Sequence, residues 1–250
     1  MKKPTLIIIC LLSISTTCYS RPNVIQLCSE NWPPIVLGKN GNMSTGGYST
    51  KVVKEVFKRL NIKVELPIQP WKRCVSMVEH GTMDGMNSCM YSKEREGYLS
   101  VTDPWVIGKG VWYYINKKFP QGFEWDNYDD FKGFKVVGVL GYAYGEEVLA
   151  AEKRGALEIH RTTNSTLAVK QLAAGRHDFF LEFNIAGDHI FNQNGLENKF
   201  SSPRKPLYVN AQRICISKKS QFHDLIPEIN DKLSEMKAEG VIEDILKGSP

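Results

Sequence analysis

Apolar residues along the first half of the chain follow two patterns in turn. Short apolar runs are typical of buried strands, and apolar side chains at helical spacing predict helices between them. The strands are predicted at 24–28, 64–68 and 84–90, and the helices at about 50–60 and 72–80. This order of strand, helix, strand, helix, strand predicts a parallel sheet with helices on its faces.

The same pattern starts again after Asp103-Pro104. Strands are predicted at 134–140, 157–161 and 178–181, and helices at 145–153 and about 165–174, the second capped by Asn164 or Ser165. Two α/β units in series predict two lobes, with the segment around 105–114 crossing between them. The tail adds a strand at 212–217 and helices at 225–236 and 241–246.

The first twenty residues differ from the rest. Lys2 and Lys3 precede an apolar run from Leu6 to Leu12, and a polar stretch ends at Ser20. The run is well short of the roughly 20 residues that span a bilayer, so it predicts a signal peptide, residues 1–20. We expect a protein that is exported.

Length and charge narrow the function classes. About 230 residues remain after cleavage, enough for two lobes that each bury a core. Without Lys2 and Lys3 there are 30 basic and 27 acidic side chains, in no long block of one sign. This mild excess argues against nucleic acid as a partner.

Four cysteines follow the predicted cleavage site: Cys28, Cys74, Cys89 and Cys215. An exported protein can pair them, in any of three connectivities. Cys74 and Cys89 are expected near one edge of a sheet, which favours a bridge between them; the alternative is that some are buried apolar side chains. No CxxC or HxxxH spacing occurs, so we expect no metal and no cofactor.

Aromatic and charged residues gather where the predicted strands end. Open α/β sheets bind ligands at the carboxyl ends of their strands, and a cleft between two such sheets can close around a small solute. The candidate ligand-binding residues selected in this way are Glu30, Trp32, Trp71, Tyr91, Tyr142, Tyr144 and Glu182.

The order of these motifs resembles the family 3 periplasmic solute-binding proteins, the polar amino-acid receptors of bacterial uptake systems. The resemblance covers nearly all of the chain after residue 22 and rests on the motifs Glu30-Asn31-Trp32-Pro33-Pro34, Trp71-Lys72-Arg73, Gly81-Thr82-Met83-Asp84, Glu94-Arg95 and Thr102-Asp103-Pro104. It implies a type II periplasmic-binding fold and a monomer. Lobe one would comprise residues 22–106 and 208–250, and lobe two 107–207.

The resemblance also implies roles for single residues of lobe one. Arg95, in Ser92-Lys93-Glu94-Arg95, matches the arginine that holds the ligand's α-carboxylate, a task that suits a planar guanidinium. Trp32 and Trp71 match the two aromatic positions that sandwich the ligand side chain. The alternatives are a surface arginine paired with a neighbouring glutamate and two tryptophans of the core. Arg73 could supply a second anion contact or lie on a helix surface.

In lobe two, Glu182 matches the position where many family members hold the ligand's α-ammonium with an aspartate; the extra methylene is a departure. Tyr142 and Tyr144 replace small residues of a loop that contacts the carboxylate, and their bulk would reshape the pocket. The alternative for both is a place on the loop surface.

The leading hypothesis is a periplasmic solute-binding protein that closes on a small zwitterionic or anionic solute, expected to be an amino acid, for an ABC-type importer. The first alternative is a cleft enzyme of the cyclohexadienyl dehydratase type, for which Glu182 is the one candidate acid. The second is a ligand-sensing partner of a signalling receptor, because the same clamp would serve a membrane sensor.

Overall fold

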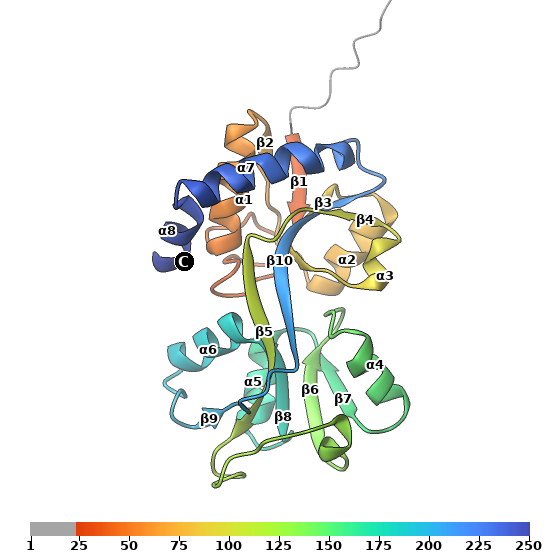
Figure 1. The fold of residues 1–250 in the computed structure, drawn as a ribbon, viewed down its shortest axis with the longest axis vertical. Coiled ribbons are helices and arrows are strands. Elements are labelled where there is room, and N and C mark those ends of the chain that lie inside the picture. Colours follow the sequence, from red (N-terminus) through yellow and green to blue (C-terminus); the bar gives the residue numbers. More distant parts are fainter. Residues whose placement is uncertain (1–23) are drawn as a thin grey trace, which may run out of the picture.

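The computed structural model describes residues 24–250, so the predicted signal peptide lies outside the described residues. The chain forms two lobes, and the long strands β5 (Val106–Ile115) and β10 (Tyr208–Ser217) run side by side between them (Figure 1). None of the helices within 24–250 is long and apolar enough to cross a membrane.

The first lobe combines both ends of the described chain. Its central strand β1 pairs in parallel with β2 on one side and β3 on the other, and β10 returns antiparallel to β3. Helices lie on both sides of this sheet (Figure 1). The remaining bounds are β1 Val24–Cys28, α1 Tyr48–Arg59, β2 Lys63–Glu65, α2 Trp71–His80, β3 Gly85–Met90, α3 Lys93–Glu96, β4 Leu99–Val101, the 3₁₀ turn His223–Leu225, α7 Ile226–Ala238 and α8 Val241–Lys247.

The second lobe also has a central set of three parallel strands with an antiparallel strand beside it. β6 lies between β7 and β8 in parallel, and β5 pairs antiparallel with β8. The bounds are the 3₁₀ turn Tyr128–Phe131, β6 Lys135–Val139, α4 Glu146–Lys153, β7 Glu158–Thr162, α5 Ser165–Ala173, β8 Phe179–Phe183, α6 Asn184–Gln193 and β9 Phe200–Ser201. The two-lobed α/β fold is therefore confirmed. Parallel pairs join β1 to β2 and β3 and join β6 to β7 and β8, whereas the pairs made by β5 and β10 are antiparallel, so the sheets are mixed. We keep the lobe boundaries at 106/107 and 207/208 as a proposal.

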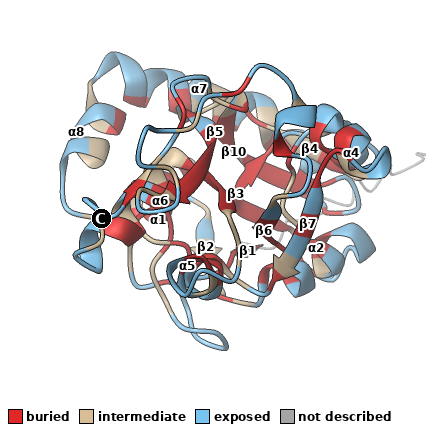
Figure 2. Cartoon of the chain, turned by 90° about the horizontal axis from the view of Figure 1, so that it is seen from below, coloured by how far each residue is buried: buried red, intermediate tan, exposed pale blue. Residues whose placement is uncertain are grey.

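The cores follow the strands. Buried residues fill the sheet, while the outer faces of the helices are exposed (Figure 2). Lobe one packs α1 and α7 against β1 and β10, and lobe two buries an aromatic cluster under the segment 116–134. That segment and α6 were not predicted, because aromatic residues without clear periodicity do not indicate an element.

Two of the strands whose bounds differ from the prediction bear on the site or on the sheet edge. The strand predicted at 64–68 ends at Glu65, and Pro67, which has no N–H to donate to a ladder, makes only an isolated bridge with Met43. The strand predicted at 178–181 runs on to Phe183, so Glu182 lies inside β8 and pairs with Val111 rather than following the strand.

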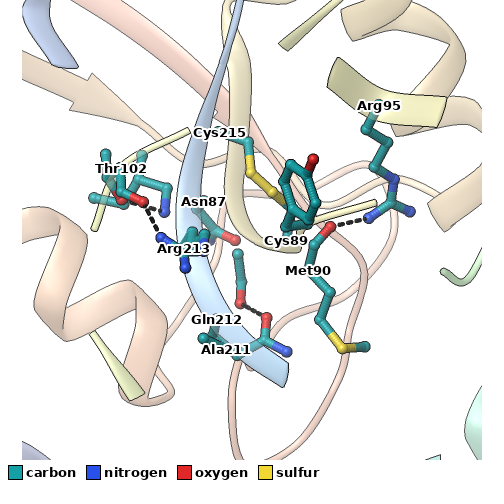
Figure 3. The surroundings of a disulfide bond; sticks show 12 residues. Asn87, Cys89, Met90, Arg95, Thr102, Ala211, Gln212, Arg213 and Cys215 are labelled. Atoms are coloured by element: carbon teal, nitrogen blue, oxygen red, sulfur yellow. Dashed lines mark hydrogen bonds between the residues drawn. A yellow bond between two sulfur atoms is a disulfide. The ribbon is translucent and has the colours of Figure 1, made fainter. Parts of the chain in front are cut away.

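The predicted bridge between Cys74 and Cys89 is wrong, although all four cysteines are paired. Cys28 bonds to Cys74 and ties the end of β1 to α2, and Cys89 bonds to Cys215 and ties β3 to β10 (Figure 3). The physical reason is the strand order: β10 inserts next to β3 and brings Cys215 to the side of Cys89. Cys74 is then left to face Cys28.

Replacing Cys28 and Cys74 together by serine is expected to lower the free energy of unfolding by about 4 kcal/mol, and replacing Cys89 and Cys215 by about 5 kcal/mol. The difference arises because the second bridge closes the longer loop, with a sequence separation of 126 against 46. Guanidinium chloride unfolding followed by far-UV circular dichroism measures both values. Unchanged midpoints in either double variant would contradict a stabilising role.

Candidate functional site

A small cavity lies between the lobes, at the carboxyl ends of β1 and β3. Its volume is about 20 Å³, which is room for about one water molecule. Lobe one supplies most of the walls, and the loop after β6 closes the cavity from lobe two. The lining residues are Ser29, Glu30, Trp32, Trp71, Ser88, Cys89, Met90, Arg95, Tyr142, Ala143 and Gln212.

Arg95 is buried at this cavity in spite of its charge. The short helix α3 carries it, and only 5 % of the residue is exposed. Nη1 donates to the Met90 carbonyl at 2.8 Å, the contact drawn in Figure 3, and Nη2 donates to the Gly141 carbonyl at 2.9 Å. Burial lowers the pKa of Arg95.

The guanidinium of Arg95 has no ion-pair partner within residues 24–250, where the acidic side chains that form ion pairs all pair with other bases. The Met90 and Gly141 carbonyls are neutral, and the neighbouring Tyr98 hydroxyl and the charge of Glu94 offset only part of the effect of burial on its pKa. Such a group suits an anion, since a carboxylate would give it stronger, charge-assisted bonds.

Three aromatic side chains meet beside Arg95. The ring of Tyr142 lies edge to face against Trp32 and Trp71, with centroid distances of 6.0 and 6.3 Å. Trp71 begins α2 and donates from Nε1 to the Gly141 carbonyl at 2.9 Å. The guanidinium of Arg95 lies 5.5 Å from the Trp71 ring centroid.

Two carboxyl groups are buried on the other side of Tyr142. Burial raises the pKa of Glu30 to about 8; the adjacent Tyr142 hydroxyl offsets part of this rise, and the charge of Glu182 adds to it. Burial likewise raises the pKa of Glu182 to about 7, against hydrogen bonds from the Ser165 hydroxyl and the Phe183 N–H that lower it. Both groups therefore hold protons readily at neutral pH.

The structure brings together Arg95, Trp32, Trp71, Glu30 and Tyr142, and two successive hydrogen bonds through Ser165 link Tyr142 to Glu182. Three other predicted residues lie elsewhere. Arg73 is exposed on α2, which places it on the helix surface. Tyr144 is buried in the core of lobe two, where its hydroxyl accepts from the Val139 N–H at 2.6 Å. Tyr91 is 40 % exposed and, with Tyr144, lines a separate groove of about 620 Å³.

Two polar wall residues were not predicted from the sequence. Ser88, on β3, donates to the side-chain oxygen of Gln212, on β10, at 2.7 Å. The side-chain nitrogen of Gln212 is a buried donor without a hydrogen-bond partner in the described part of the chain, and the Trp32 indole lies close enough to Glu182 to lower the pKa of that carboxyl. Gln212 carries no local signal, because it lies inside a strand that mixes polar and apolar residues and its neighbours on β3 are more than 120 positions away.

The arrangement suits a small molecule that carries opposite charges. It offers a cation and neutral donors at one end, flat aromatic faces beside them, and two acids at the other end. No group of three or more metal-ligating side chains occurs within residues 24–250.

Comparison with known proteins agrees with this geometry. The family described as bacterial extracellular solute-binding proteins, family 3, matches residues 25–248. Among individual relatives, the "Probable amino-acid-binding protein YxeM" of Bacillus subtilis (strain 168) is 22 % identical over 212 residues, which are 84 % of this chain and 76 % of that protein.

Solved structures share the fold at low identity. One is the substrate binding protein of an amino acid ABC transporter, with a TM-score of 0.71 and 17 % identity over 89 % of this chain and 97 % of that one. Another is the ancestral amino acid-binding protein AncCDT-1, a precursor of cyclohexadienyl dehydratase, with a TM-score of 0.73 and 16 % identity over 90 % and 94 %. With its family match over nearly the whole described chain, the protein belongs to the bacterial extracellular solute-binding proteins of family 3.

Proposed function

We propose that this protein captures a single amino acid with a polar or basic side chain in the cavity between its lobes and presents it to an ABC-type importer. The observation that carries the proposal is the pairing of a buried guanidinium without a carboxylate partner, Arg95, with two buried carboxyl groups, Glu30 and Glu182. Burying charged groups without opposite charges is costly, so such a site is built for a charged solute.

The α-carboxylate would bind at Arg95. Its guanidinium and the Trp71 indole N–H already point at one oxygen, the carbonyl of Gly141. A carboxylate oxygen at that place would accept both bonds and neutralise the guanidinium. Lobe one would thus hold the anionic end of the solute.

The α-ammonium would bind between the acids. Glu182 comes from β8 of lobe two and Glu30 from the loop after β1 of lobe one, so an ammonium between them would join the lobes. The second acid leaves one negative charge for a donor on the solute's side chain. The faces of Trp32 and Trp71 favour a cationic or flat side chain there.

Entry requires movement, because a cavity of about 20 Å³ does not admit an amino acid. The strands β5 and β10 run between the lobes, and a rotation about them would open the cleft and leave both sheets intact (Figure 1). A membrane partner would read the closed form through surfaces of both lobes.

A second candidate function, a dehydratase acting in the same cleft, is favoured by one observation. The raised pKa of Glu182, about 7, would let it act as a general acid at neutral pH. Incubation of concentrated protein with cyclic hydroxy acids, followed by mass spectrometry, tests for loss of water. A product whose formation stops in Glu182→Gln would replace binding by catalysis as the function.

A thermal-shift screen of residues 21–250 against amino acids, organic acids, polyamines and sugars is expected to give its largest shifts with polar or basic amino acids. A solute at 100 times its dissociation constant adds about 2.7 kcal/mol of stability, which raises the melting temperature by about 5 to 11 degrees in a protein of this size. Shifts with sugars alone, or with no solute at all, would contradict the proposal.

Arg95→Ala is expected to weaken binding of the best amino acid from the screen at least ~30-fold, because truncating one partner of a buried charge pair costs about 2–5 kcal/mol. Arg73→Ala is the matched control, since Arg73 is exposed on α2 and outside the cavity. Isothermal titration calorimetry measures both. Wild-type affinity in Arg95→Ala would exclude the carboxylate contact, and circular dichroism would show whether the variant is folded.

The affinity for that amino acid is expected to rise as the pH increases from about 6 to about 8.5. Glu30 and Glu182 hold protons in the free protein because their pKa values are about 8 and about 7, and an ammonium binds only to their ionised forms, so binding releases protons. Isothermal titration calorimetry at pH 6.5 in two buffers of different ionisation enthalpy gives the number of protons released on binding. Proton uptake, or the same count in Glu182→Gln, would contradict this assignment.

A further inference from the structure

Gly141 and Tyr142, both from the loop of lobe two, occupy the half of the site that belongs to lobe one. The Gly141 carbonyl accepts from Trp71 Nε1 and from Arg95 Nη2, each at 2.9 Å. These are two donors from lobe one on a single oxygen from lobe two. They are also the donors that the proposed function assigns to the solute's carboxylate.

The Tyr142 side chain extends from the Gly141 position toward Glu30 and Glu182. Its ring lies against Trp32 and Trp71, and its hydroxyl lies 3.3 Å from the Ser165 hydroxyl, which in turn donates to Glu182. The same hydroxyl is close enough to Glu30 to lower the pKa of that carboxyl. The phenol thus reaches from the aromatic walls to both acids.

The loop is shaped for this close approach. Gly141 has a φ of +80°, a conformation that side chains disfavour. A Cβ at this position would lie 3.2 Å from Cδ1 of Trp71 and 3.4 Å from Cδ of Lys72. Glycine therefore lets the carbonyl come within hydrogen-bond distance of the lobe-one donors.

We propose that Gly141 and Tyr142 form an internal competitor for the solute, which makes Tyr142 a specificity-determining residue. The carbonyl takes the place of the solute's carboxylate, and the phenol takes the place of its side chain. This inference rests on the proposed function for the identity of the site. The competitor holds the lobes together before a solute arrives, and a solute must displace it to bind.

Only solutes with certain chemical groups can displace Gly141 and Tyr142. A solute repays the lost contacts only if it supplies an acceptor for Arg95 and Trp71, a flat group for the tryptophans, and a donor for the acids. An amino acid whose side chain ends in a guanidinium or an imidazole meets all three demands, whereas an aliphatic side chain of equal length lacks the donor. The competitor also reduces the apparent affinity by the fraction of molecules in which it is seated.

The decisive test is small-angle X-ray scattering of protein from which bound solutes were removed by unfolding, dialysis and refolding with the disulfides intact. The wild type is expected to scatter as the closed form, and Tyr142→Ala is expected to have a larger radius of gyration. Tyr144→Phe is the matched control, because that hydroxyl bonds to Val139 at the end of β6, within lobe two. Equal radii for the solute-free wild type and Tyr142→Ala would overturn the proposal.

Calorimetry with L-arginine and with L-norleucine tests the selection. The dissociation constant of L-arginine is expected to fall in Tyr142→Ala, and the preference for L-arginine over L-norleucine is expected to shrink. Weaker binding of L-arginine in Tyr142→Ala would show that Tyr142 is a wall of the site and not a competitor. If Tyr142→Ala does not fold, Tyr142→Phe removes only the hydroxyl contacts and is expected to shift both measurements in the same direction.

The two proposals can fail separately. If neither L-arginine nor any other amino acid binds the wild type or the variants, the proposed function fails. The scattering comparison still decides whether Gly141 and Tyr142 hold the lobes together.

Discussion

The burial of Arg95 is the constraint on which the rest of the site depends. A guanidinium removed from water must be given partners, and here these include the neutral carbonyls of Met90 and Gly141 beside the Tyr98 hydroxyl. One of these comes from the adjoining strand and the other from the opposite lobe. The contact between the lobes is therefore part of the solvation of one charge, so a solute that offers a better partner to this charge acts at once on the closure of the whole molecule.

Both disulfides stiffen lobe one, the half of the site that contains Arg95. Cys28 precedes Glu30 by two positions, and its partner Cys74 follows Trp71 by three. Cys89 lines the cavity, and its partner Cys215 lies on β10, one of the two strands that run between the lobes. The sheet of lobe one is thus cross-linked by two disulfides, and the loop of lobe two that contacts it contains Gly141. This division places the adjustable part of the site on the side without a cross-link.

The lobes and many of their helices and strands could be predicted from the sequence, because periodic patterns of apolar residues are local. Trp32 and Trp71 could be placed near strand ends for the same reason, whereas Arg95 was identified by its resemblance to a family motif. The directions of the Arg73 and Tyr144 side chains could not be predicted. Each lies two positions after a residue that lines the cavity, yet Arg73 points to solvent and Tyr144 into the core of lobe two. Gln212 and the pairing of Cys89 with Cys215 were also out of reach, because both depend on the insertion of β10 beside β3.

The uncharged phenol of Tyr142 is compatible with the raised pKa values of Glu30 and Glu182. A phenol donates a hydrogen bond but carries no charge, so it leaves Glu30 and Glu182 without a cation and burial keeps their protons on. A solute that brings one ammonium can ionise one acid, and a solute with a second cationic group can ionise both. Each ionisation converts a neutral contact into a charged one in a site of low polarity, where that difference is large. In the proposed site, selectivity for basic over neutral solutes would then follow from the pair of acids, and Tyr142 would set the affinity that a solute must exceed to displace it.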